Sequence, residues 1–78
     1  MSKFTVHNGK RYRAIISLRW WEQIATNDKI AKMLRDVGFI DVRVSGNGEI
    51  REAKGLWPLK DTTAEIPPQV SSIQEIEV

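Results

Sequence analysis

A short segment near the middle of the chain constrains the fold most, because it predicts an antiparallel hairpin. Apolar and polar side chains alternate from Phe39 to Ser45, which is the period of a strand with one buried face. The turn Gly46-Asn47-Gly48 follows, and Asn-Gly tolerates positive φ at both central positions of a tight turn. Glu49 to Trp57 returns as a second strand, whose mixed faces are typical of an edge strand or of a bulge at Gly55.

A strand and a helix precede this hairpin. Arg11 to Leu18 alternates strictly, with Tyr12, Ala14, Ile16 and Leu18 on one face. The spacing of Ile30, Ala31, Leu34 and Val37 predicts a helix over Asp28 to Val37. Thr26 or Asn27 is expected to cap this helix, and Gly38 is expected to end it in the left-handed conformation. Residues Trp20 to Ala25 fit either an earlier helical turn or a structured loop.

The order of elements predicts a small α+β domain of the type β-α-β-β(-β). One main helix is expected to pack on one face of a three- to four-stranded sheet, so the other face needs water or a partner. Residues 1–10 form a polar lead-in or an edge strand, residues 11–57 the β-α-β-β body, and residues 58–69 a proline-containing loop. Residues 70–78 form either a final strand or an extended docking arm.

Composition and charge exclude some functions. The 78 residues include no cysteine, which rules out disulfides and thiolate metal sites. No apolar run is long enough to span a bilayer and the N-terminus lacks an apolar signal segment, so we expect a cytoplasmic location in the producing cell or incorporation in a virion. Residues 1–45 carry nine basic and four acidic side chains, whereas residues 46–78 carry three basic and six acidic ones. Opposite charge on the two halves favours neutralisation within the fold or contacts between copies.

Catalytic chemistry is not expected. His7 is the single histidine and lies in the polar lead-in, where a solvated or turn histidine is the usual interpretation. The serines have no nearby histidine pattern, and the acidic residues lack the paired spacing of a hydrolase or metal site. We therefore predict no enzyme activity, no catalytic residue, no metal and no cofactor.

Protein contact is the first binding hypothesis. Tryptophan and arginine dominate interface energetics, and Trp20 beside Arg19 is expected to face outward as an anchor, while Trp21 and Trp57 fill the core. The apolar residues of the last segment are expected either to close the sheet or to add to the sheet edge of a neighbour. Those residues are Ile73, Ile76 and Val78.

Nucleic-acid binding is the rival hypothesis. Arg11 and Arg13 share a strand face, Arg43 is expected to join them from a neighbouring strand, and Arg19 with Trp20 would add a cation and a stacking ring. A solvated face carrying arginines is the alternative that needs no ligand. Binding to nucleic acid would weaken steeply as salt rises.

Two resemblances bear on function. The segment "RYRAIISL…AKMLRDVGFIDVRVSGNGEIREAKG", over about residues 11–55, resembles a SPOR-type peptidoglycan-binding repeat in its order of strand, helix ending in glycine, strand, hairpin and strand. That resemblance implies peptidoglycan binding. The whole chain, with its extended end "GLWPLKDTTAEIPPQVSSIQEIEV", is similar to small accessory proteins of tailed phages, which implies a virion or assembly role. We predict a noncatalytic protein-interaction or assembly component, and more specifically a small structural or accessory protein of a phage.

Overall fold

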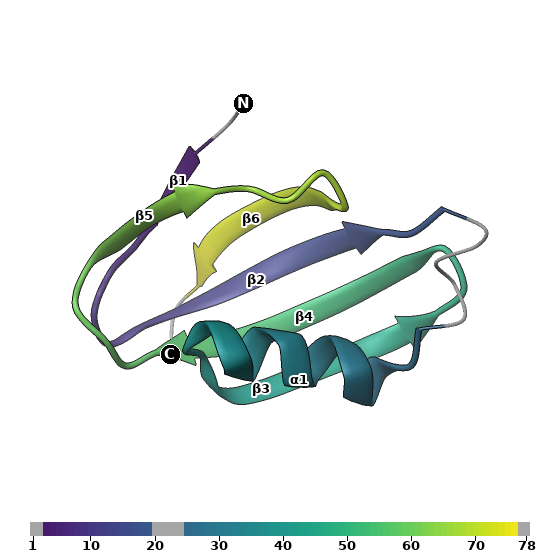
Figure 1. Cartoon of the computed structure of the whole chain (residues 1–78), viewed down its shortest axis with the longest axis horizontal. Helices are drawn as coiled ribbons and strands as arrows, with labels where there is room; N and C mark the ends of the chain where they lie inside the picture. The colour runs from purple at the N-terminus through teal and green to yellow at the C-terminus, as the bar shows by residue number, and fades with distance from the viewer. Residues whose placement is uncertain (1–2, 20–24, 77–78) are drawn as a thin grey trace.

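The computed structural model describes residues 3–19 and 25–76, which form one helix, a four-stranded sheet and a two-stranded ribbon (Figure 1). The elements follow in the order β1 (Lys3–Val6), β2 (Lys10–Ser17), α1 (Asn27–Val37), β3 (Ile40–Asn47), β4 (Ile50–Trp57), β5 (Thr62–Glu65) and β6 (Val70–Ile76). The main sheet has the order β3-β4-β2-β6 with antiparallel neighbours, and β1 pairs with β5 in the ribbon. The predicted α+β class, with one helix on a small sheet, is confirmed.

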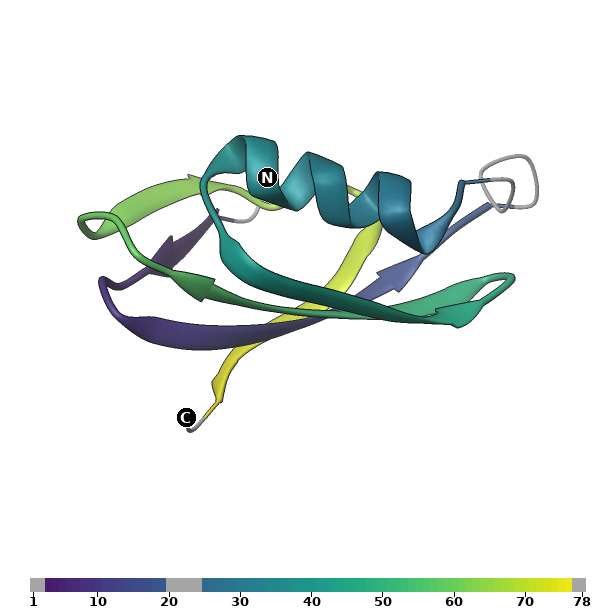
Figure 2. The same ribbon diagram turned by 90° about the horizontal axis from the view of Figure 1, so that it is seen from below.

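The helix and the ribbon lie on the same side of the main sheet (Figure 2). Beneath α1 the core is small, and it contains Ile16, Leu18, Ile30 and Ala53. These residues come from β2, from the segment just after it, from α1 and from β4, so the helix packs on the two central strands of the sheet. The opposite face of the sheet carries no described element. We call it the outer face, and the side beneath α1 the core face.

The helix follows its predicted caps closely. Thr26 Oγ1 accepts a hydrogen bond from the Lys29 amide at 3.1 Å, and Gly38 ends the helix with φ of 135°. Ile30 and Ala31 are buried as the apolar spacing predicts. Val37, in contrast, is 66% exposed, because the last helical turn extends past the core and overhangs the space beside the ribbon.

The hairpin forms, but two details of its prediction are wrong. The strands extend to Asn47 and Ile50, so the tight turn is Gly48-Glu49 and positive φ occurs at Gly46 and Gly48 rather than at Asn47. β4 is a central strand, paired with β2 as well as β3, and its pairing with β2 is regular through Gly55. Gly55 packs against the Phe39 ring, which explains a small residue there without a bulge in β4.

The C-terminal third contains more strand than predicted. The proline-containing segment 58–69 is not a simple loop, because Thr62–Glu65 forms β5 and pairs with β1. All four β5 residues are exposed, so this strand has no apolar alternation that a sequence pattern would detect. Residues Val70–Ile76 form β6, a strand of the domain's own sheet beside β2, rather than an arm that extends away.

A buried arginine fixes the start of the helix against the hairpin. Arg51 in β4 is 4% exposed, and its guanidinium donates to the Gly48 carbonyl at 3.1 Å, the Ala25 carbonyl at 2.9 Å and Asn27 Oδ1 at 2.8 Å. Asn27 also donates from Nδ2 to the Gly46 carbonyl at 2.9 Å. A buried charge needs such partners, and here they join the first helical turn to the hairpin turn. The arginine thereby positions α1 over the sheet.

Candidate binding groove

An apolar groove of about 420 Å³ lies between α1 and the β1–β5 ribbon, over the core face of the main sheet. Leu34 and Val37 line it from the helix, and Ala64 and Ile66 line it from β5 and the residue that follows the strand. The volume is within the range of sites that bind small molecules or peptide side chains. The groove exists because one helix is too narrow to cover four strands.

Small side chains deepen the floor of the groove. Ala14 in β2 is the direct cross-strand partner of Ala53 in β4, and on its other side it faces Ile73 in β6. Two alanines side by side leave space that larger apolar residues would fill. The strict alternation of β2, visible in the sequence, therefore places a hollow as well as a core on this face.

Aromatic rings stand at both walls of the groove. Phe4 contacts Tyr12 edge to face with ring centroids 5.6 Å apart, and Phe39 contacts Trp57 in the same way at 4.9 Å. All four rings line the groove. Tyr12 and Trp57 are buried, which confirms the core position predicted for Trp57. Fixed rings of this kind provide large apolar contact area at low entropic cost.

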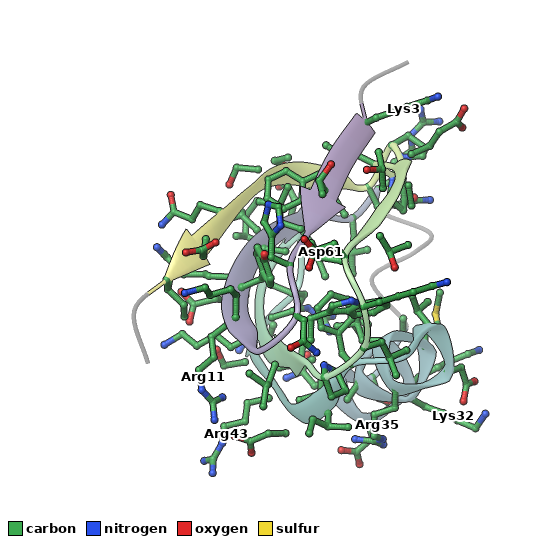
Figure 3. All side chains as sticks on the ribbon, turned by 90° about the vertical axis from the view of Figure 1, so that its left-hand side faces the viewer. Lys3, Arg11, Lys32, Arg35, Arg43 and Asp61 are labelled. Atoms are coloured by element: carbon green, nitrogen blue, oxygen red, sulfur yellow. The ribbon has the colours of Figure 1, made fainter. Side chains whose placement is uncertain are left out.

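Polar contacts at one end hold the ribbon in place. The Asp61 carboxylate accepts from the Asn8 amide at 2.8 Å and lies 2.9 Å from His7 Nδ1. Asn8 Nδ2 donates to the carbonyls of Pro58 and Leu59, so the β1–β2 turn and the β4–β5 connection are tied together. The pKa of the Asp61 carboxyl is lowered, mainly by its hydrogen bond with His7 and to a smaller extent by the one from the Asn8 amide. Figure 3 shows Asp61 beside the end of β1.

The outer face carries the predicted basic residues in a different arrangement. Arg43 and Arg13 are both cross-strand partners of Lys54, because β4 lies between β3 and β2. Arg43 is therefore not on the strand next to Arg13, and Lys54 is a fourth cation that sequence reasoning missed. Arg11 and Arg43 point to the same side, away from α1 (Figure 3).

Two carboxylates pair with these cations. Asp41 lies 2.7 Å from Arg11 Nη2 and 4.0 Å from Arg43 Nε. Glu52 lies 2.6 Å from Arg13 Nε and 3.7 Å from Lys54 Nζ. The arginine hydrogen bonds lower the pKa of both carboxyl groups, so these groups stay ionised to a lower pH than free carboxyl groups would. Each acid is shared by two bases, and the face keeps an excess of positive charge.

The residues predicted to bind protein are not brought together. Trp20, Trp21 and Val78 lie outside the described residues, and Arg19 is exposed just beyond β2. Ile73 faces the groove, whereas Ile76 is the cross-strand partner of Arg11 on the outer face. The two isoleucines therefore belong to different surfaces, because a spacing of three along a strand places side chains on opposite faces.

Sequence reasoning did not find the groove. Its lining comes from the helix and all six strands, and neither the exposed β5 nor the overhang of Val37 has a local sequence signature. The one available signal was the pair of alanines among larger residues in two alternating strands. Within residues 3–19 and 25–76, no group of three or more His, Asp or Glu side chains has a geometry that could hold a metal ion. No helix in those segments has the length and apolarity to cross a bilayer.

Comparisons of the chain with protein-family models, curated proteins and solved structures gave no match.

Proposed function

We propose that this domain is a noncatalytic protein-interaction component whose groove binds an extended apolar segment of a partner protein. The observation that carries the proposal is the open groove, in which aromatic and aliphatic side chains from both sheets and the helix line one continuous hollow. An apolar hollow of this size beside a small core favours occupation by apolar side chains of another molecule.

The walls favour an extended partner. β5 pairs with β1, and its other edge borders the groove opposite α1 (Figures 1 and 3). A strand added beside β5 would place alternate side chains toward the alanine floor, while its backbone bonds the strand edge. Val37 and Leu34 would contact the same side chains from the helix.

The outer face supports nucleic-acid binding less well. Its cations are shared with Asp41 and Glu52, and the four described aromatic rings line the groove instead of this face. Stacking rings contribute much of the affinity for single strands. Nucleic-acid binding through Arg11, Arg13 and Arg43 is therefore the second hypothesis, and the binding experiment below includes an oligonucleotide to test it.

The finer expectations remain predictions. Four expectations extend the proposal: a place in a phage particle, self-assembly, a cytoplasmic location and peptidoglycan binding. The last of these is supported by the element order β2-α1-β3-β4, which is the order that the SPOR resemblance implies. Purified peptidoglycan fragments are a direct probe for the last of these.

The test selects short displayed peptides against the domain and measures their binding by fluorescence anisotropy. We expect peptides with alternating apolar residues, and Val37→Lys should weaken their binding by about tenfold or more because it brings a charge to the groove. Lysine suits the last turn of a helix, so the fold should persist. Met33→Lys is the matched control, since Met33 is 61% exposed on the same helix and does not line the groove.

Equal binding to both helix variants, or failure to select any peptide, would contradict the proposal. A labelled single-stranded oligonucleotide supplies the competing arm. Binding of the oligonucleotide that falls steeply with salt and is lost in Arg13→Gln would favour the nucleic-acid hypothesis.

A further inference from the structure

A second surface, the free edge of β6, is built to pair with another strand. β6 bonds β2 on one side, and no described strand lies on its other side (Figure 3). We propose that two copies of this chain join through their β6 edges, antiparallel and about a two-fold axis, so that the two main sheets form one continuous sheet. The inference goes beyond the proposed function, because it concerns a different surface and a different partner.

The hydrogen bonds of β2 show which β6 amides are free to pair. The Leu18 amide bonds the Glu49 carbonyl at 2.7 Å, and the Ser17 amide bonds the Gln69 carbonyl at 2.8 Å. Residues alternate in an antiparallel strand, so the even-numbered residues of β2 bond β4 and the odd-numbered ones bond β6. Arg11 and Arg13 then bond their partners Ile76 and Gln74. The backbone groups of Ile73 and Glu75 consequently point to the free edge.

The opposite edge of the sheet is protected against such pairing. β3 has a register shift between Ile40 and Arg43, where Asp41 adopts a φ of 51°, and it carries exposed charges at Asp41 and Arg43. Bulges and charged residues are the usual devices that block edge strands. β6 has its irregularity at its start, beside Ile16, and is regular from Ser72 to Ile76.

The β6 sequence suits a two-fold pairing. If Gln74 lies opposite Gln74 of the second copy, the free backbone groups of Ile73 in each copy pair with those of Glu75 in the other copy. This register puts Glu75 opposite an isoleucine and keeps the like charges apart. The two Gln74 side chains face each other on the outer face, where amides are self-complementary donors and acceptors.

The test is sedimentation velocity of the whole chain over a wide concentration range. We expect a concentration-dependent dimer of the wild type. Glu75→Pro should raise its dissociation constant by about tenfold or more, because it removes an edge amide from each copy. The amide of residue 75 does not bond β2, so proline should leave the fold intact, which circular dichroism would check. Glu75→Ala, which keeps the amide, is the control and should dimerise like the wild type.

A wild type that stays monomeric at all concentrations overturns the inference, as does a dimer that Glu75→Pro leaves unchanged. Neither result affects peptide binding to the groove, which Val37→Lys tests separately. A dimer that Val37→Lys abolishes and Glu75→Pro preserves would place the contact in the groove and also overturn pairing through β6.

Discussion

Replacement of Arg51 by methionine tests how the wall of the groove is held in place. Arg51→Met keeps the length and the apolar part of the side chain but removes the guanidinium. The Gly48 and Ala25 carbonyls and Asn27 Oδ1 then lose donors at 2.8 to 3.1 Å. The first turn of α1 would no longer be bonded to the hairpin by this side chain.

The expected cost follows from these contacts. A hydrogen bond from a charged group contributes about 1.5–3 kcal/mol, but burial of the guanidinium opposes folding and water reaches the half-buried acceptors after its removal. We therefore expect a loss of about 2–4 kcal/mol in the free energy of unfolding. For a domain of this size that corresponds to a fall of roughly 10–30 °C in Tm.

Urea unfolding followed by tryptophan fluorescence measures the change. Arg11→Met is the matched control, because Arg11 forms a partly exposed pair with Asp41 and should contribute about 0–1 kcal/mol. A loss at Arg51 no larger than at Arg11 would refute the reasoning that the buried guanidinium positions the helix.

Two further substitutions test the end of the helix and the turn contact of the ribbon. Gly38→Ala should lower the free energy of unfolding by about 1–3 kcal/mol, because the added Cβ would lie 3.0 Å from Leu59 Cδ1 and 3.1 Å from the Trp57 ring. Gly9 also has positive φ but open space around it, so Gly9→Ala should cost less stability in the same thermal melts. Asp61 has a lowered pKa, so its contribution to stability is present above its unfolded pKa and is lost as pH falls from about 4 through the folded value. Urea titrations of Asp61→Asn should therefore differ from wild type at pH 7 and converge with it once the pH falls below the folded pKa of Asp61, and a constant difference down to acid pH would contradict the pairing of Asp61 with His7 and the Asn8 amide.

The sequence was sufficient to predict the elements whose signals are local. The α1 caps at Thr26 and Gly38 depend on residues within one turn, and the alternation of β2 depends on neighbours two positions apart. Both predictions are confirmed by the structure. The exact turn was misplaced because Gly46 and Gly48 both tolerate positive φ, and the register of β4 against β2 helps decide where the chain reverses.

The site could not be predicted because it depends on contacts between distant segments. β5 has four exposed residues and forms by pairing with β1, nearly 60 residues earlier in the chain. Insertion of β4 between β2 and β3 separated Arg13 from Arg43, although both residues were correctly expected on a solvent-facing side. Ile73 and Ile76 were grouped by apolar character, whereas strand geometry places them on different faces.

The most direct measurement of the central claim is a titration of the isotopically labelled domain with a selected apolar peptide, followed by amide chemical shifts. If the groove is the binding site, the largest shifts should occur in β5 and around Val37 and Ala14, which border it. Shifts concentrated instead at Arg11, Arg13 and Arg43, which do not line the groove, would place binding on the outer face and contradict the proposed function.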